Sequence, residues 1–293
     1  MIVETRSLTK VYGGRPALDA VDLRVAEGSV YGLVGPNGSG KTTLLSIVAG
    51  LRRASDGSVV LGVPRSALAI LPDTPEFEPW LTAFEVVDLA RALVNPSIPR
   101  ERVTEVLVEA GLRDAIDRRA GGFSRGMLQR LGVASTLIGD PALMLLDEPC
   151  SALDPMGRRE VLDLVASQRG QRTVIFSSHI LSDVQEVCDT VGILQRGQMI
   201  FQGALADLLT GDRTPGVLVR VRDDAEGVAR SLASEPWVAS AVATAPGEVR
   251  VGVHSTEQAE SLLAGALARA GARVVSVRPE EASLEQVFLE MTK

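Results

Sequence analysis

The segment from Gly35 to Thr42 carries the clearest chemistry in this sequence of 293 residues. It reads Gly-Pro-Asn-Gly-Ser-Gly-Lys-Thr and matches the phosphate-binding pattern G-x-x-x-x-G-K-[ST] at every fixed position. Glycines let successive backbone N–H groups turn towards phosphate oxygens, and a following helix adds the partial positive charge of its N-terminus. We therefore predict a loop that binds ATP through Gly35, Pro36, Asn37, Gly38, Ser39, Gly40, Lys41, Thr42 and Thr43.

The last two residues of the pattern are predicted to have separate roles. The Lys41 ammonium is expected to reach the β- and γ-phosphates, and the Thr42 hydroxyl is placed to ligate Mg²⁺. The lysine is informative because only Lys10, Lys41 and Lys293 occur among 30 basic residues. A chance glycine turn is the alternative, but an apolar run precedes the loop and a helical pattern follows it, which is the context that the motif requires.

Two adjacent carboxylates follow another apolar run. Residues 142–146 read Ala-Leu-Met-Leu-Leu and lead into Asp147 and Glu148. On a parallel sheet, such a strand end emerges beside the phosphate loop. Asp147 is predicted to hold the Mg²⁺ shell, and Glu148 to polarise a water for in-line attack on the γ-phosphate. A solvated acidic turn is the simpler alternative, but together with the phosphate loop the pair predicts a P-loop NTPase that hydrolyses ATP.

An α/β fold must position these residues. The first twenty-five residues alternate in hydropathy around Gly13 and Gly14, which predicts an N-terminal antiparallel sheet. Residues 29–34 and the segments after residue 142 are apolar strands that alternate with helices, which predicts a parallel core sheet. Residues 82–138 are mostly helical in pattern and form an inserted helical subdomain. The first domain is predicted to span residues 1–210.

A second, smaller domain is predicted for residues 217–293. Turn-forming residues from Thr210 to Gly216 provide the linker. The segments after it alternate in the order β-α-β-β-α-β and end in a helix that begins at Ser283. This order matches the ferredoxin-like, split-βαβ motif, so the domain is predicted to be a small α+β fold.

The composition excludes several classes of protein. A net charge of −7 without long like-charge runs gives no sign of nucleic acid as a partner. No stretch approaches the length and apolarity of a membrane span, so we expect a cytoplasmic chain. The two cysteines, Cys150 and Cys188, lack metal-ligand spacing and are expected to be buried small apolar residues in a reducing compartment.

Further motifs specify the kind of NTPase. The run Phe123-Ser124-Arg125-Gly126-Met127 resembles the signature motif of ATP-binding cassette (ABC) proteins, and it precedes the carboxylate strand as in that family. Ser151-Ala152-Leu153-Asp154 resembles the D-loop, His179 the switch histidine, and Tyr12 the aromatic residue that stacks on adenine. The resemblance covers roughly residues 1 to 210.

The resemblance implies a head-to-tail dimer, either a homodimer or a heterodimer, with ATP between the phosphate loop of one subunit and the signature of the other. Ser124, Arg125, Gly126 and Met127 would then contact ATP across the interface. His179 would hydrogen-bond the γ-phosphate and sense its loss; for His254 a structural role is expected.

Two positions depart from the family pattern. Asp73 stands where the family has its Q-loop glutamine; it could still bind Mg²⁺ through water, although its side chain is shorter and charged. Arg125 and Met127 replace the usual glycine and glutamine of the signature, as in the branch that exports drugs, antibiotics and lipids. The last helix also resembles the ending of that branch.

The resemblance predicts the ATPase subunit of a transporter that drives a separately encoded permease from the inner face of the cell membrane. A soluble ABC ATPase acting on nucleic acid or translation is the alternative, although the expected second cassette, coiled coil and basic patches are missing. A catalytically dead cassette is disfavoured because Lys41, Asp147, Glu148 and His179 are all present. For Trp80, a contact with the permease and packing against the helical region remain equal alternatives.

Overall fold

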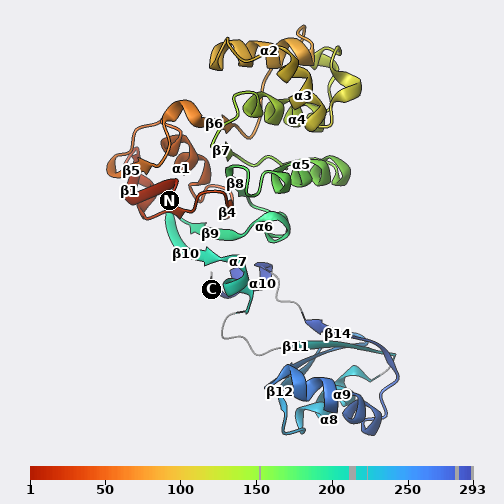
Figure 1. Cartoon of the computed structure of the whole chain (residues 1–293). Coiled ribbons are helices and arrows are strands. Elements are labelled where there is room, and N and C mark those ends of the chain that lie inside the picture. Colours follow the sequence, from red (N-terminus) through yellow and green to blue (C-terminus); the bar gives the residue numbers. More distant parts are fainter. Residues whose placement is uncertain (152, 211–215, 223, 281–283, 292–293) are drawn as a thin grey trace. The chain divides into compact units, whose positions relative to one another are not determined.

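The computed structural model describes residues 1–151, 153–210, 216–222, 224–280 and 284–291 (Figure 1). The chain forms two compact units. The first takes Met1–Leu208 and the end of the chain from Phe288, and the second takes Leu209–Val287. Within the described ranges, no helix combines the length and the apolar character needed to cross a lipid bilayer.

A six-stranded sheet forms the centre of the first unit, in the order β10-β9-β4-β8-β7-β6. Its strands are β4 (Val30–Val34), β6 (Leu68–Leu71), β7 (Leu143–Leu146), β8 (Thr173–Ser178), β9 (Thr190–Gln195) and β10 (Gln198–Ala204). The five strands from β9 to β6 are parallel, which confirms the predicted core. β10 adds an antiparallel edge that the hydropathy pattern did not indicate. Arg196 and Gly197 both have positive φ at this turn, as a two-residue hairpin requires.

The predicted N-terminal antiparallel sheet is also confirmed. It contains β1 (Val3–Tyr12), β2 (Arg15–Val21), β3 (Arg24–Val25) and β5 (Asp56–Leu61), of which β5 lies outside the segment that suggested the sheet. A shared apolar core joins this sheet to the central sheet and to helix α1 (Lys41–Val48) through fully buried Leu18, Val25, Tyr31, Leu44 and Leu143. Burial of such a side chain stabilises the fold by about 1.5–3 kcal/mol. Because Leu44 lies on α1, this core holds the start of α1 in place.

The inserted helical region contains α2 (Ala83–Val94), α3 (Glu101–Glu109) and α4 (Arg125–Leu137), which pack together (Figure 1). Ser124 caps α4 and accepts a hydrogen bond from the Met127 N–H, which fixes the start of the helix at Arg125. The remaining helical segments of this unit are α5 (Pro155–Ser167), α6 (Leu181–Val187), α7 (Leu205–Thr210) and the short 3₁₀ turns η1 (Arg65–Ala67), η2 (Arg113–Ala115) and η3 (Ala120–Gly122).

The second unit has the predicted order of elements. It contains β11 (Gly216–Val221), α8 (Ala225–Ala233), β12 (Val238–Ala245), β13 (Glu248–Val253), α9 (Thr256–Arg269) and β14 (Val274–Glu280). The strands form one antiparallel sheet in the order β12-β13-β11-β14, as in the ferredoxin-like motif. Helix α10 (Leu284–Met291) follows. Residues 211–215 of the predicted linker and Ser283, the predicted helix start, lie outside the described residues.

Candidate active site

Backbone lines the phosphate loop between β4 and α1. A Cβ on Gly38 would meet nothing within 4 Å, whereas a Cβ on Gly35 would lie 2.1 Å from the Leu194 carbonyl oxygen. Gly40 has φ +111°, and a Cβ there would lie 2.5 Å from the Ala17 carbonyl oxygen. The loop is therefore open towards solvent and closed on its inner side, where only glycine fits. This shape suits a cradle of N–H groups for phosphate.

The remaining loop residues divide by exposure. Pro36, Asn37 and Thr42 are exposed, and Thr43 is half-buried. The Ser39 side chain is 2% exposed, and its Oγ has no hydrogen-bond partner among the described residues. An unpartnered buried hydroxyl in this loop fits a site that becomes complete when a ligand with hydrogen-bonding oxygens enters.

Lys41 lies buried between the loop and the carboxylate strand. Its Nζ donates to the carbonyl oxygens of Gly35 at 2.7 Å and Pro36 at 3.3 Å, and lies 3.2 Å from Glu148 Oε1. The side chain is 6% exposed and Glu148 is 13% exposed, so solvent screens this ion pair only weakly. Triphosphate oxygens entering the loop would compete with these acceptors for the ammonium.

A serine that the sequence did not single out organises the two carboxylates. Ser177 Oγ donates to Asp147 Oδ1 at 2.6 Å and accepts from the Glu148 N–H at 2.9 Å. Ser177 is fully buried on β8, and its neighbour Phe176 pairs in register with Leu146, directly before Asp147. In the sequence, the only indication of this role was that Ser177 lies near the end of the apolar run TVIFSS. Its contact with Asp147 depends on the pairing of β7 with β8, which the sequence does not show.

Glu148 is also held by His179. The His179 Nδ1 lies 2.8 Å from Glu148 Oε2, and the His179 N–H donates to the same oxygen at 3.4 Å. Glu148 itself has φ +48°, a left-handed backbone conformation that is uncommon for a non-glycine residue and costs about 1–3 kcal/mol. The structure thus brings Lys41, Glu148 and His179 together around one carboxylate.

Asp73 lies in the electrostatic field of the same carboxylates. Asp73 is exposed, but partial desolvation raises the pKa of its carboxyl, and the negative charges of Asp147 and Glu148 raise it further, while Arg125 and His179 act in the opposite direction. The metal-ligand prediction for Asp73 is therefore compatible with its position. Among the described residues, no group of three or more His, Cys, Asp or Glu side chains could hold a metal ion by itself. Mg²⁺ would need further oxygen ligands, which phosphates supply.

Tyr12 ends β1 with 40% of its surface exposed. Lys10 Nζ lies 4.9 Å from the ring centroid, and Arg52 Nη1 donates to the Tyr12 hydroxyl at 3.1 Å. The sequence did not indicate Arg52 as a partner of this ring. Lysine and arginine together orient an aromatic surface near the end of α1, which suits the predicted stacking on adenine.

The signature residues lie at the start of α4. Ser124 caps α4, and a Cβ on Gly126 would lie 3.8 Å from Leu153, so the start of α4 packs on the segment before α5. Within the described ranges, no hydrogen bond or ion pair joins Ser124, Arg125, Gly126 or Met127 to the phosphate loop or to Glu148.

The segment after Glu148 is buried and capped. Cys150 is 3% exposed, and burial raises the pKa of its thiol to about 12. Cys188 is also buried, so the predicted burial of both cysteines is confirmed. Asp154 caps α5 through the Gly157 N–H at 3.0 Å. Of the predicted D-loop, Ala152 lies outside the described residues.

Trp80 is 62% exposed, which favours the contact alternative over packing against the helical region. Phe77 in the same segment is half-buried. His254 is exposed, and its backbone N–H donates to the Trp237 carbonyl. His254 belongs to the second unit, whereas Glu148 belongs to the first.

The fold and the grouped phosphate loop, carboxylates and histidine define a P-loop ATPase. A family model described as "ABC transporter" matches residues 18–151. The chain is 36% identical to the ABC transporter ATP-binding protein YxlF of Bacillus subtilis (strain 168), over 99% of both chains. It is 34% identical to the bacitracin transport ATP-binding protein BcrA of Bacillus licheniformis, over 68% of each chain. A solved ATP-binding subunit of an ABC transporter superposes with a TM-score of 0.64 at 27% identity, covering 72% of this chain and 92% of that one.

This chain belongs to the ABC transporter ATP-binding proteins. It is the ATP-binding and ATP-hydrolysing subunit of a transporter, as the signature, D-loop and switch motifs predicted. The alternative of a soluble ABC ATPase acting on nucleic acid or translation receives no support from these relatives.

Proposed function

We propose that Lys41 and the backbone of the phosphate loop bind the triphosphate, and that Glu148 activates the attacking water. The main observation behind this proposal is that both carboxylate oxygens of Glu148 have a partner. One forms an ion pair with Lys41, and the other contacts His179. A carboxylate fixed this way can orient a water for in-line attack, while His179 contacts the γ-phosphate and responds to its loss. Tyr12 stacks on the base.

Mg²⁺, when bound with ATP, would supply positive charge that offsets the negative charge of the phosphates. Thr42 and Asp147 are the proposed ligands, with Asp73 acting through water. The exposed Thr42 hydroxyl follows Lys41 in the loop, and one oxygen of Asp147 remains beyond its bond from Ser177. Hard oxygen donors of this kind are the ligands that Mg²⁺ prefers.

Two subunits share each ATP in this proposal. Ser124, Arg125, Gly126 and Met127 of one subunit face the phosphate loop of the other, and the capped start of α4 offers its N–H groups to the γ-phosphate. ATP closes the dimer and hydrolysis reopens it. The lack of any hydrogen bond or ion pair between the signature and the phosphate loop, among the described residues of one chain, supports this sharing, for either a homodimer or a heterodimer.

The cycle drives a separately encoded permease, with this chain at the inner, cytoplasmic face of the cell membrane. Export of drugs, antibiotics or lipids is the proposed transport direction and cargo class. Support comes from the likeness to a bacitracin transport protein and from the Arg125 and Met127 signature. Residues 1–210 are proposed as the ATPase domain and residues 217–293 as an accessory domain.

A mixing experiment tests the shared site. The variants Lys41→Ala and Ser124→Arg should each be inactive, because each destroys one half of every site. In an equimolar mixture, half of the dimers would contain one intact site, so we expect about a quarter of wild-type ATPase activity. Thermal melting of each variant controls for folding. A mixture that stays inactive, with both variants folded and mixed dimers shown to be present, would contradict the proposal.

A further inference from the structure

Strand β14 forms an uncovered edge of the second unit. In the sheet order β12-β13-β11-β14, it pairs with β11, and no described strand pairs with its other side. Its valines are unusually exposed for strand residues: Val274 by 44%, Val275 by 58% and Val277 by 48%. Apart from Pro279, which has no N–H, an edge of this kind presents unpaired backbone N–H and C=O groups, to which another extended chain can bind.

The helical layer leaves this edge incomplete. Helix α8 packs on β12 and β13, and α9 packs on β13. Val277 lies opposite Val219 in the register, and Val219 is fully buried, so both valines belong to the helix-covered face. Val277 nevertheless keeps nearly half of its surface in solvent. A further strand beside β14 would cover it.

The opposite face of the sheet carries arginines. Leu218 lies between Arg278 on β14 and Arg250 on β13, and Arg220 follows two residues later on the same face. All three arginines are exposed. Arg220 and Arg278 make no hydrogen bond or ion pair within the part of the chain that the structure describes. The carboxylate opposite Arg220, Glu248, accepts a hydrogen bond from Thr244 Oγ1 at 3.0 Å.

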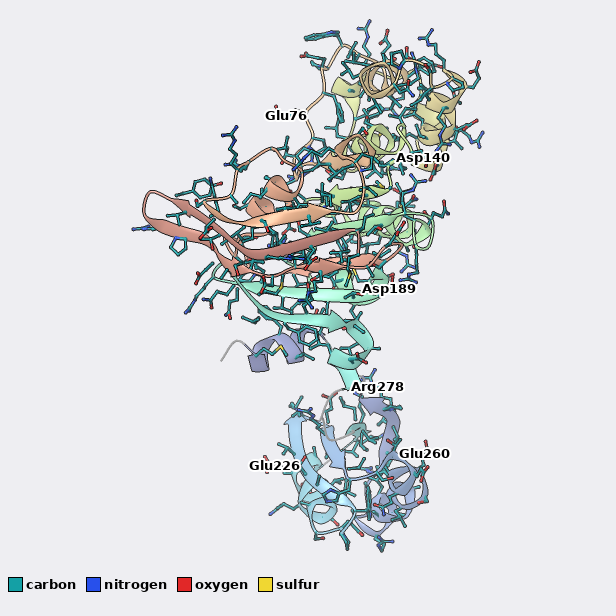
Figure 2. All side chains as sticks on the ribbon, turned by 60° about the vertical axis from the view of Figure 1, so that its left-hand side comes forward. Glu76, Asp140, Asp189, Glu226, Glu260 and Arg278 are labelled. Atoms are coloured by element: carbon teal, nitrogen blue, oxygen red, sulfur yellow. The ribbon has the colours of Figure 1, made fainter. Side chains whose placement is uncertain are left out.

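Acidic side chains gather instead on the helices. Glu226 lies on α8 and Glu260 on α9, and Figure 2 labels both together with Arg278 on β14. Residues 216–287 contain more acidic residues than arginines. The unit as a whole therefore repels a large polyanion or an anionic membrane. A narrow segment along β14 would instead lie beside Arg278, with Arg220 on the neighbouring strand β11.

We propose that β14 is a docking edge for an extended acidic polypeptide segment, which adds to the sheet as a further strand. Because side chains alternate between faces, carboxylates at every second position would lie beside Arg278, and apolar residues between them would cover Val277. Nucleic acid is a poorer fit, because the four strands β11, β12, β13 and β14 contain no aromatic residue on which bases could stack. A second copy of β14 would bring further arginines to the same face.

A labelled octapeptide of alternating Glu and Val is the probe, measured by fluorescence anisotropy with the full-length, nucleotide-free protein. Saturable binding is expected, with slower hydrogen exchange in Val274–Glu280. Arg278→Glu should weaken binding about tenfold or more, because a charge-assisted contact is replaced by repulsion. Val277→Lys should also weaken peptide binding, because it changes the helix-covered face of the sheet, on the side opposite to the arginines. The matched control is Arg230→Glu on α8, which should bind like wild type.

Several outcomes would overturn the proposal. These are absence of saturable binding, equal binding of a Lys-Val octapeptide, equal loss in Arg230→Glu and Arg278→Glu, and unchanged exchange in β14. Binding of anionic vesicles or RNA that is lost in Arg278→Glu would assign the edge to another ligand, and nucleotide-free dimerisation lost in Val277→Lys would assign it to a second copy. Basal ATPase activity of Arg278→Glu should equal that of the wild type, which separates this site from the nucleotide site.

Discussion

Replacing Ser177 by alanine should damage both the stability and the catalytic rate of the ATPase unit. The hydroxyl donates to the buried carboxylate of Asp147 at 2.6 Å and accepts from the Glu148 N–H at 2.9 Å. A hydrogen bond to a charged group contributes about 1.5–3 kcal/mol and a neutral one about 0.5–1.5 kcal/mol, so Ser177→Ala should cost about 3 kcal/mol. At about 2–4 °C per kcal/mol, the Tm should fall by roughly 6–12 °C.

The rate should fall further than nucleotide binding does. The serine fixes the carboxylates proposed for Mg²⁺ and for water activation, whereas Lys41 and the loop backbone hold the phosphates. We therefore expect kcat to fall by about tenfold or more, since 1.36 kcal/mol corresponds to a factor of ten, while the Kd for ATP changes only a few-fold. Melting by calorimetry, steady-state ATPase assays and titration with ATP measure the three quantities.

A matched serine gives the control. Ser135 Oγ on α4 donates to the Leu131 carbonyl one turn earlier, a bond that helices lose at little cost. Ser135→Ala should therefore keep the wild-type Tm and kcat. If Ser177→Ala behaves like Ser135→Ala in both assays, the organising role assigned to Ser177 is refuted.

The remaining predictions concern Lys41 and the two cysteines. Lys41→Ala should abolish high-affinity ATP binding. A wild-type Kd from titration calorimetry would contradict the assignment of residues 35–42 as the phosphate-binding loop. Burial raises the pKa of Cys150 to about 12 and that of Cys188 well above its usual range, so a thiol reagent at pH 8 should label neither cysteine until the protein unfolds. Keeping the two thiols protonated in the folded protein contributes to its stability. Because the folded pKa values are raised, this contribution is present below about pH 8.5 and declines towards pH 12. Rapid labelling of the folded protein, or a denaturation midpoint that does not change between about pH 8.5 and pH 12, would contradict this prediction.

Sequence was most informative where spacing along the chain alone sets the chemistry. The phosphate loop needs only consecutive residues between a strand and a helix, and Asp147 and Glu148 follow from where their strand ends. The order of strands and helices in the second unit was likewise readable, because each element has its own hydropathy period.

Features that depend on contacts between distant segments could not be derived in this way. Ser177 reaches Asp147 only because β7 and β8 pair in one particular register. Arg52, in the segment between α1 and β5, donates to the hydroxyl of Tyr12, which lies forty residues earlier in the chain. The edge strand β10 depends on a turn at Arg196 and Gly197, where a non-glycine residue adopts positive φ. Tertiary packing decides these cases, and local propensity carries little information about them.

The most direct test of the shared ATP site is the oligomeric state of Glu148→Gln with ATP. This substitution keeps the size of the side chain near Lys41 and His179 but removes the proposed water-activating carboxylate. The nucleotide should then bind without being hydrolysed and hold two subunits together. Size-exclusion chromatography should show a stable dimer with ATP and Mg²⁺ and a monomer without nucleotide. A monomer under both conditions, with ATP bound, would contradict the account.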